Sequence, residues 1–431
     1  MKRSRAGSKN LSAGLGLACV ALLASACTSP RFGQKATEPP HAFIAYHPPP
    51  EGSTGLRLAV KDLIDIEGQV TTAGSRYLAE TSAPAERDAK CLRIARERGV
   101  TIVGKANLSE FATGVSGMND YFGTPENPVT PKRNRMPGGS SSGSAVAVAL
   151  GMADVALGTD TAGSVRAPAA SCGIAGLKTT YGLVSLEGVY PISPDHLDTV
   201  GPMARDVGGL VEGMDLLENG FRAKFAAARA AKPSPGAVRV GRLYVPGTDP
   251  AIDRAIDDVL FSNGFQVYRM SERFLEEWKQ AEADGNAMAA AGAYQTNRDK
   301  QIRRRVSFRA KSAIALGSLT DRTVFEAAVE RKPDWQRTLR QVFRGLDVIA
   351  LPVLNHPPFK IPIFDEPAVT EARVLAMQNT AAVNYAGNPA LALPVPMIED
   401  GAAVPFTSIQ LVGPPGSEAQ LLNVGRLIES K

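Results

Sequence analysis

Histidine is scarce in this sequence. Only four occur among 431 residues, at positions His41, His47, His196 and His356. A serine–histidine–acid triad needs a histidine beside its nucleophile. His41 and His47 lie in or next to a proline-rich segment, His356 lies in a proline-rich loop, and the surroundings of His196 favour a structural loop. The sequence therefore disfavours nucleophilic catalysis that depends on histidine.

Cysteine is equally rare, with four residues in the chain. Cys19 falls inside an N-terminal apolar run and Cys27 follows that run directly. Cys91 and Cys172 remain, and the apolar residues around each predict a small core side chain. A disulfide between them stays open, because sequence gives no geometry for one.

Long apolar runs are also missing. The N-terminal run from about Leu11 to Leu23 is too short for a permanent span of roughly 20 residues. It follows the basic residues Lys2, Arg3, Arg5 and Lys9, so residues 1–26 are predicted to be an export signal.

The end of that signal, Leu23-Ala24-Ser25-Ala26-Cys27, resembles a bacterial lipobox, although Ala24 stands where leucine is usual. This predicts lipidation of Cys27, which becomes the first mature residue, and a chain tethered to a bacterial membrane on the periplasmic or external side. Ala24-Ser25-Ala26 also suits ordinary cleavage. A soluble exported protein and an uncleaved anchor therefore remain alternatives.

Charge of one sign is not in excess once the signal is removed. The whole chain has 48 basic and 43 acidic residues, and the signal takes away four basic ones, which leaves 44 against 43, a net charge of +1. Nothing in this balance indicates nucleic acid as a partner. The local basic run Arg303-Arg304-Arg305 is interpreted as a solvated helix face.

The rest of the chain divides into two parts. Residues 27–55 contain Pro39-Pro40 and Pro48-Pro49-Pro50, which favours an extended tether. From residue 56 to 431, apolar runs such as Leu58–Val60 and Asp154–Leu157 alternate with helical patterns such as Ser144–Leu150. Residues 271–345 are helix-rich and polar, as in a cap. We expect one large α/β domain with a mixed, mostly parallel central sheet covered by helices.

One serine follows a buried strand and a turn of small residues, Gly158-Thr159-Asp160-Thr161-Ala162-Gly163-Ser164. Small residues let backbone N–H groups converge on one point near a helix N-terminus, which is what a developing oxyanion needs. The alternative is a serine that only caps the helix.

A second serine cluster lies upstream, Gly138-Gly139-Ser140-Ser141-Ser142-Gly143-Ser144. Its Gly139-x-Ser141-x-Gly143 formally matches the nucleophile elbow of esterases. That elbow needs a buried strand directly before it, and residues 132–137 are polar and broken by Pro137. We therefore reject the elbow as the leading interpretation.

A lysine, Lys61, ends the apolar strand Leu58-Ala59-Val60. Its amine either reaches solvent or is buried, and burial lowers the pKa of a lysine until it can act as a base near neutrality.

These segments together, and in this order, resemble the amidase signature family. The likeness covers roughly residue 56 to the end. The matching stretches are Val60–Asp65, Gly104–Phe111, Phe122–Pro128, Gly138–Ser144, Gly158–Pro168, Gly173–Gly182, Asp198–Asp206, Asn384–Pro396 and Gln410–Gly416.

The resemblance implies a role for each residue of the constellation. Ser164 is then the nucleophile, Ser140 (after a cis peptide bond from Gly139) the proton shuttle and Lys61 the base. The oxyanion is held by the N–H groups of Thr161, Ala162, Gly163 and Ser164. Supporting roles fall to Ser141, Asp160 and Arg166, and the substrate-lining residues are Gly117, Met118 and Asn119. No metal or cofactor is implied.

The expected activity is hydrolysis of a linear carboxamide, other than a peptide bond, to a carboxylate plus ammonia or an amine through an acyl-serine. The partners are then a small-molecule amide and, through Cys27, a membrane, with no nucleic acid and no obligate protein partner. Three alternatives remain: a catalytically silent envelope binding protein on the same fold, an esterase that uses Ser141, and the glutaminase subunit of a tRNA-dependent amidotransferase. The export signal disfavours the last of these.

Overall fold

The computed structural model describes residues 40–430 except 131, 321, 400 and 401. The predicted signal, Cys27 and the first part of the predicted tether lie outside the described residues.

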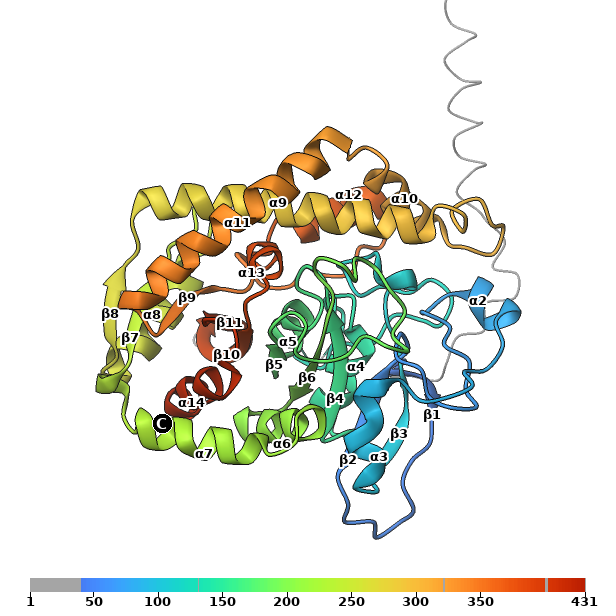
Figure 1. Ribbon diagram of the computed structural model, residues 1–431. Coiled ribbons are helices and arrows are strands. Elements are labelled where there is room, and N and C mark those ends of the chain that lie inside the picture. Colours follow the sequence, from blue (N-terminus) through green and yellow to red (C-terminus); the bar gives the residue numbers. More distant parts are fainter. Residues whose placement is uncertain (1–39, 131, 321, 400–401, 431) are drawn as a thin grey trace, which may run out of the picture. The chain divides into compact units, whose positions relative to one another are not determined.

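Eleven strands within the described residues form one sheet, in the order β1-β3-β2-β4-β6-β5-β10-β11-β9-β7-β8 (Figure 1). Their bounds are β1 Phe43–Tyr46, β2 Arg57–Lys61, β3 Thr101–Ala106, β4 Val155–Asp160, β5 Ala175–Lys178, β6 Thr199–Ala204, β7 Arg239–Arg242, β8 Gln266–Arg269, β9 Val348–Pro352, β10 Ala390–Glu399 and β11 Ala402–Val412.

The prediction of a mixed sheet in a single α/β domain is confirmed, but the prediction that the sheet is mostly parallel is wrong. Six of the ten pairings between described strands are antiparallel, and only β2–β3, β2–β4, β7–β8 and β7–β9 are parallel. A strand that is buried on both faces is a continuous apolar run in either orientation, so the sequence pattern does not reveal direction.

Strand alternation decides which way the site residues point. In β2, Leu58 and Val60 belong to the core that α6 covers, whereas Ala59 belongs to the core around α4 and α5. Successive side chains of a strand point to opposite faces. The side chain of Lys61 therefore leaves the strand on the same face as that of Ala59, toward α4 and α5.

Helices cover both faces of the sheet. Their bounds are α2 Arg76–Thr81, α3 Arg93–Glu97, α4 Ser142–Ala149, α5 Arg166–Cys172, α6 Val207–Leu217, α7 Phe221–Ala231, α8 Pro250–Asn263, α9 Glu272–Asn297, α10 Phe308–Gly317, α11 Arg322–Gly345, α12 Pro367–Leu375, α13 Ala381–Ala386 and α14 Glu418–Glu429. Figure 1 shows α6, α7 and α14 along one side, and the long helices α9 and α11 along the other. None of the described helices is long and apolar enough to cross a membrane.

The helix-rich region predicted at residues 271–345 is present as α9, α10 and α11. The basic run is not on a helix, however: Arg303, Arg304 and Arg305 are exposed in the connection between α9 and α10. Cys91 and Cys172 are both buried and free, so no disulfide joins them.

The predicted boundary between tether and domain, at residues 55 and 56, lies too far along the chain. Strand β1 lies inside residues 27–55 and pairs antiparallel with β3, and Phe43 is buried in the core. Asn107 donates its backbone N–H to the Ala42 carbonyl at 2.9 Å. The folded unit therefore includes β1, and the domain begins before residue 56.

Candidate active site

Lys61 and Ser140 meet in the interior although 79 residues separate them in the chain. Lys61 Nζ lies 2.8 Å from Ser140 Oγ and 2.8 Å from Thr159 Oγ1. All three side chains are buried. The Gly139–Ser140 peptide bond is cis, which confirms that part of the prediction.

Burial lowers the pKa of Lys61 to about 7, although the negative charges of Asp160 and Asp198 partly raise it. Removing an ammonium group from water disfavours its charged form, which is why desolvation dominates. A large fraction of Lys61 is then a neutral amine near neutral pH. Such an amine has one lone pair and two N–H groups, so it can donate to Thr159 while its lone pair faces Ser140.

Ser164 lies in the turn between β4 and α5, against the segment that carries Ser140. The Ser141 N–H donates to the Ser164 carbonyl at 3.3 Å. Ser164 is half-buried, whereas Ser140 and Ser141 are fully buried. Of the three serines assigned roles, Ser164 is thus the one that a substrate can reach directly.

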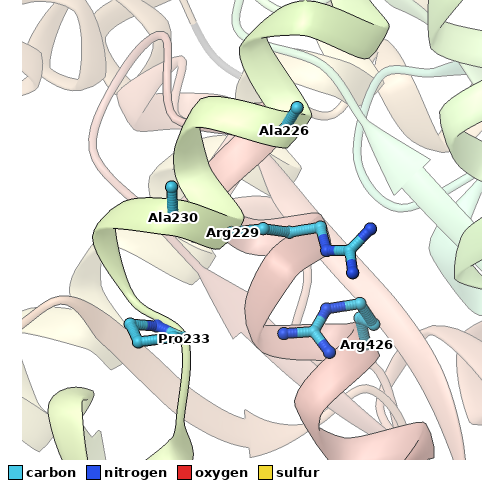
Figure 2. Close-up of a pocket in the computed structure, with 5 residues that line it drawn as sticks. All are labelled: Ala226, Arg229, Ala230, Pro233 and Arg426. Carbon is cyan, nitrogen blue, oxygen red and sulfur yellow. The ribbon is translucent and has the colours of Figure 1, made fainter.

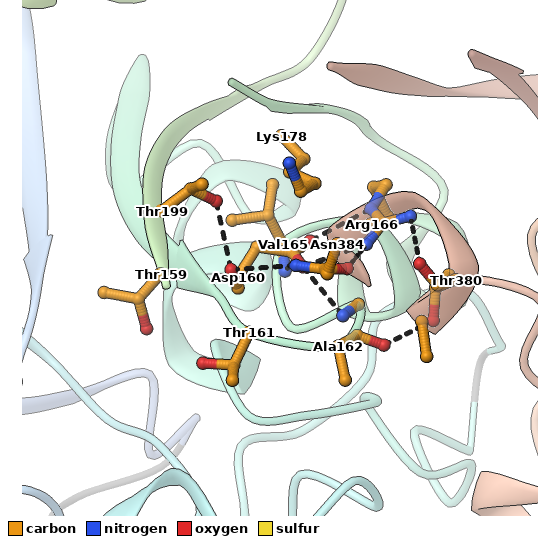
Figure 3. A network of polar contacts seen from close by, with 12 residues as sticks. Thr159, Asp160, Thr161, Ala162, Val165, Arg166, Lys178, Thr199, Thr380 and Asn384 are labelled. Carbon is orange, nitrogen blue, oxygen red and sulfur yellow. Dashed lines mark hydrogen bonds and ion pairs between the residues drawn. The ribbon is translucent and has the colours of Figure 1, made fainter. Parts of the chain in front are cut away.

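The turn is held by a buried ion pair at its two ends (Figure 3). Asp160 Oδ1 accepts the Gly163 N–H at 2.7 Å, and Oδ2 accepts the Val165 N–H at 3.1 Å. Arg166 donates to both oxygens of the same carboxylate, at 2.9 and 3.0 Å. Burial opposes ionisation of Asp160, but Arg166 and Lys178 together hold its pKa well below the usual range. The fixed charge pair keeps the backbone of the turn in one conformation.

This arrangement changes the predicted oxyanion donors. Because the Gly163 N–H already donates to Asp160, an oxyanion would have to share it. The N–H groups of Thr161, Ala162 and Ser164 stay predicted donors. The Thr161 hydroxyl donates to Asp198 Oδ1 at 2.7 Å, which fixes this side of the turn.

Side chains from the C-terminal half complete the support of the turn. Arg166 also donates to the Thr380 carbonyl at 3.0 Å and to Gln410 Oε1 at 2.6 Å. The Asn384 amide donates to Asp160 at 2.9 Å, and Thr380 Oγ1 donates to the Ala162 carbonyl at 2.5 Å. Figure 3 shows Arg166, Thr380 and Asn384 on the side of the turn next to Asp160.

Several of these residues were missed by the sequence analysis. Thr159, Asp198, Asn384 and Gln410 all fall in stretches that carry the family resemblance, so a signal existed, but spacing alone assigned them no role. Glu282 had no such signal. It lies on α9 and accepts the N–H groups of Thr380, Ala381 and Ala382 at 2.9 to 3.1 Å.

The predicted substrate-lining residues divide into two groups. The segment before Gly117 is hydrogen-bonded directly to the segment that carries Ser140, because the Gly138 and Gly139 N–H groups donate to the Ser116 and Val115 carbonyls at 3.1 and 2.8 Å. Met118 packs into a small apolar cluster with Met136. Gly117 and Met118 stay predictions.

The prediction that the Asn119 side chain binds substrate is wrong. Its amide nitrogen donates to the Gly74 and Leu108 carbonyls, and its oxygen accepts the N–H groups of Tyr121 and Phe122. Four hydrogen bonds use the donor and acceptor capacity of this buried side chain. The Asn119 side chain therefore links its loop to the Gly74 and Leu108 carbonyls and has no donor or acceptor left for a substrate.

Two surface cavities lie away from Lys61, Ser140 and Ser164. One of about 410 Å³ lies between α7 and α14, where Arg229 and Arg426 line it (Figure 2). Another of about 620 Å³ is lined by Lys224, Asp347 and Gln420 among others. Neither is lined by Lys61, Ser140 or Ser164.

Comparison with known proteins identifies the family of this chain. The amidase family matches residues 49–422. The chain belongs to the amidase family, whose enzymes hydrolyse carbon–nitrogen bonds. A glutamyl-tRNA(Gln) amidotransferase subunit from Natronomonas pharaonis is 34% identical over 410 residues, which cover 86% of this chain and 94% of that protein.

Two further relatives show the breadth of the family. The 2-amino-5-chloromuconic acid deaminase of Comamonas testosteroni is 34% identical, covering 87% of this chain and 81% of that protein. A crystal structure of an amidase superposes with a TM-score of 0.71 at 29% identity, covering 87% of this chain and 84% of the other. The amidase family thus combines one fold with different substrates.

Proposed function

We propose that this amidase family chain is an exported enzyme that hydrolyses a linear carboxamide to a carboxylate and ammonia or an amine through an acyl-Ser164 intermediate. The observation that carries the proposal is the buried contact of 2.8 Å between Lys61 Nζ and Ser140 Oγ. The segment of Ser140 is bonded to that of the half-buried Ser164 through the Ser141 N–H, which donates to the Ser164 carbonyl at 3.3 Å. A serine hydroxyl needs a positioned base before it becomes a good nucleophile.

The proton moves along these three residues. Neutral Lys61 accepts the proton of Ser140 while Ser140 accepts that of Ser164, and Ser164 Oγ attacks the amide carbon. The proton then returns along the relay to the leaving nitrogen, and the C–N bond breaks. Water, activated through the same relay, then hydrolyses the acyl-enzyme. General-base catalysis of this kind contributes typically about 10²- to 10⁴-fold in rate.

The negative charge that forms on the carbonyl oxygen needs donors already in place. The turn at residues 161–164 offers them, and its conformation is held by Asp160, Arg166 and Thr380. Because these supports are buried and hydrogen-bonded, little reorganisation is needed when the charge develops.

The amidotransferase subunit is the second candidate, since relatives with that name are similar over most of this chain. The predicted signal at residues 1–26 favours the exported amidase, because charged tRNA is cytoplasmic. An esterase that uses Ser141 is disfavoured by geometry: Ser141 is fully buried, its Oγ lies 3.3 Å from the Thr159 carbonyl, and no strand precedes it at residues 132–137, all of which are described. A silent binding protein is disfavoured because all three catalytic side chains are present.

We propose further that the mature chain begins at a lipidated Cys27 and is tethered to a bacterial membrane on the periplasmic or external side. The basic n-region and the lipobox-like sequence support this. Metabolic labelling with an alkyne fatty acid tests it. Label should reach the wild type and be lost in Cys27→Ser, and an unlabelled wild type would leave soluble export as the better explanation.

The activity is tested by ammonia release from a panel of acetamide, propionamide, benzamide and glutamine, with Ser164→Ala as the matched control. We expect turnover of at least one linear amide by the wild type and none above background by Ser164→Ala. Turnover of glutamine alone would favour the amidotransferase subunit. Turnover that survives in Ser164→Ala would refute the assigned nucleophile.

A further inference from the structure

The side chain of Gln378 ends in a buried amide whose nitrogen has no partner among the described residues. Gln378 lies in the connection between α12 and α13, and it is only 6% exposed. No described residue accepts a hydrogen bond from its Nε2 atom. A buried donor without an acceptor destabilises a fold, so such groups are rare in native proteins. The amide of Gln378 therefore needs a functional explanation.

The backbone around this amide is held in place. The Gln378 N–H donates to the Leu375 carbonyl at 3.1 Å, and the next N–H, of Asn379, donates to the Val353 carbonyl at 3.1 Å. Gln378 also forms a single β-bridge with Leu354. The side chain therefore leaves the backbone at a fixed point of the fold.

The two polar side chains that follow Gln378 are used within the fold. Asn379 Nδ2 donates to the Pro352 carbonyl at 3.1 Å. Thr380 Oγ1 donates to the Ala162 carbonyl at 2.5 Å, as Figure 3 shows. Two of three consecutive polar side chains thus stabilise the fold, whereas no described residue takes the hydrogen bonds that Gln378 Nε2 can donate.

The Gln378 amide lies against the turn that carries the nucleophile. A Cβ added at Gly163 would lie 3.2 Å from Gln378 Oε1, and it would also meet Thr380 Oγ1. The absence of a side chain at Gly163 lets the amide approach the backbone closely. Gly163 directly precedes Ser164, which is half-buried. A substrate bound at Ser164 therefore has the Gln378 amide among its neighbours.

An unpartnered carboxamide selects its ligand by hydrogen bonds and not by charge. Its nitrogen has two N–H donors, so the matching group is an oxygen acceptor. The guanidinium of the turn, Arg166, already pairs with Asp160. Burial lowers the pKa of Lys61 to about 7, so this amine is in large part neutral. A carboxylate buried here would lack a full counter-charge, which makes a neutral oxygen the better fit.

We infer that Gln378 binds a second, neutral oxygen of the substrate. The preferred substrate is then an amide whose acyl part carries a further carbonyl or carboxamide group. This inference rests on the proposed function, because it names the substrate class of the same acyl-Ser164 reaction. Gln378 is a specificity-determining residue in this reaction, since a site with a buried donor rejects analogues that leave the donor unpaired.

Binding to the full chain carrying Ser164→Ala tests the inference without turnover. The probes are two matched pairs, succinamide with 4-methylpentanamide and glutaramide with 5-methylhexanamide. In each pair an isopropyl group replaces the second carboxamide, and the two pairs differ in chain length. Isothermal titration calorimetry should show at least one diamide binding at least about tenfold more tightly than its match. Adding Gln378→Met should remove this preference by weakening the binding of the diamide.

The melting temperature of Gln378→Met separates substrate binding from structural support. Methionine keeps an unbranched side chain and removes the amide. Because no described residue is bonded to Gln378 Nε2, the melting temperature should stay the same or rise. A fall of several degrees, with equal weakening of both amides of a pair, would mean that Gln378 supports the fold and would overturn the inference.

The remaining outcomes are also decisive. Equal affinities within both pairs, including no binding of any amide, overturn the inference, and so does a preference that survives in Gln378→Met. Tighter binding of succinamic acid than of succinamide overturns it as well, because the bound group is then a carboxylate. A fluorophosphonate separates this inference from the proposed function. Label on wild-type Ser164 without discrimination between the amides refutes only the role of Gln378, whereas absence of label refutes the catalytic proposal.

Discussion

At the scale of single residues, burial is what lowers the pKa of Lys61 to about 7. The strand end predicted an unusual lysine, but only the fold shows that the amine is enclosed and contacts both Ser140 and Thr159. The sequence could identify residue types and their order. It could not show which polar groups were already satisfied. Asn119 was therefore assigned to the substrate, whereas its side chain is fully hydrogen-bonded to its own loop and to the Gly74 and Leu108 carbonyls.

We predict that acylation depends on pH with a midpoint near 7. The pKa of Lys61 is lowered to about 7, so the amine is protonated and unable to accept a proton below that pH, and the rate should rise as pH increases through it. Stopped-flow measurement of the acylation rate from about pH 5 to 9 checks this.

Lys178 provides the matched control, because burial lowers its pKa to about 7 as well. The midpoint should persist in Lys178→Met if Lys61 is the titrating group. Lys61→Arg keeps a cation that is not deprotonated in proteins. It should lower the rate by about 10²- to 10⁴-fold above the midpoint, and by less at lower pH, where Lys61 of the wild type is itself protonated. A rate that is flat between about pH 6 and 8 in the wild type contradicts the assignment.

At the scale of elements, the turn between β4 and α5 depends on supports from distant parts of the chain. Thr380 contacts this turn, and Glu282 on α9 holds the backbone of Thr380. The sequence predicted the strand and the turn because small residues and a buried run are local signals. The supports were unpredictable in detail, because they come from residues far away along the chain.

We predict that Gly163→Ala abolishes most acylation. Gly163 has φ of +132°, and an added Cβ would overlap Thr380 Oγ1. The turn must therefore shift, and the N–H groups at residues 161–164 move with it. We expect at least a roughly tenfold slower reaction with a serine-directed probe.

The control for this glycine is Gly182→Ala. Gly182 also has a positive φ, +80°, but an added Cβ there meets nothing within 4 Å. It shares the backbone strain without the contact with Thr380. Equal losses in the two variants would mean that general destabilisation, and not the position of the turn, explains the effect.

At the scale of the whole molecule, the limit of the folded unit is the main difference between sequence and structure. Proline-rich composition predicted a tether through residue 55, and it hid the four-residue strand β1. A strand this short at the edge of a sheet has too few alternating residues to stand out from its flanks. The pairing of β1 with β3 is what shows that this strand belongs to the sheet.

We predict that Phe43→Ala lowers the free energy of unfolding by about 3 kcal/mol, because it removes a buried aromatic ring from the core. Urea denaturation followed by circular dichroism measures this. Tyr46→Ala, in the same strand but 39% exposed, should cost about 1 kcal/mol or less. If both substitutions are without effect, β1 is not part of the cooperative unit.

The proposed relay from Lys61 through Ser140 to Ser164 is best tested with an active-site probe. The full chain is treated with a fluorophosphonate, and the modified residue is mapped by mass spectrometry in the wild type, Lys61→Ala and Ser141→Ala. We predict label on Ser164 in the wild type and in Ser141→Ala, and its loss in Lys61→Ala. Label on Ser141 that does not depend on Lys61 would contradict it, and so would folded wild-type protein that takes no label.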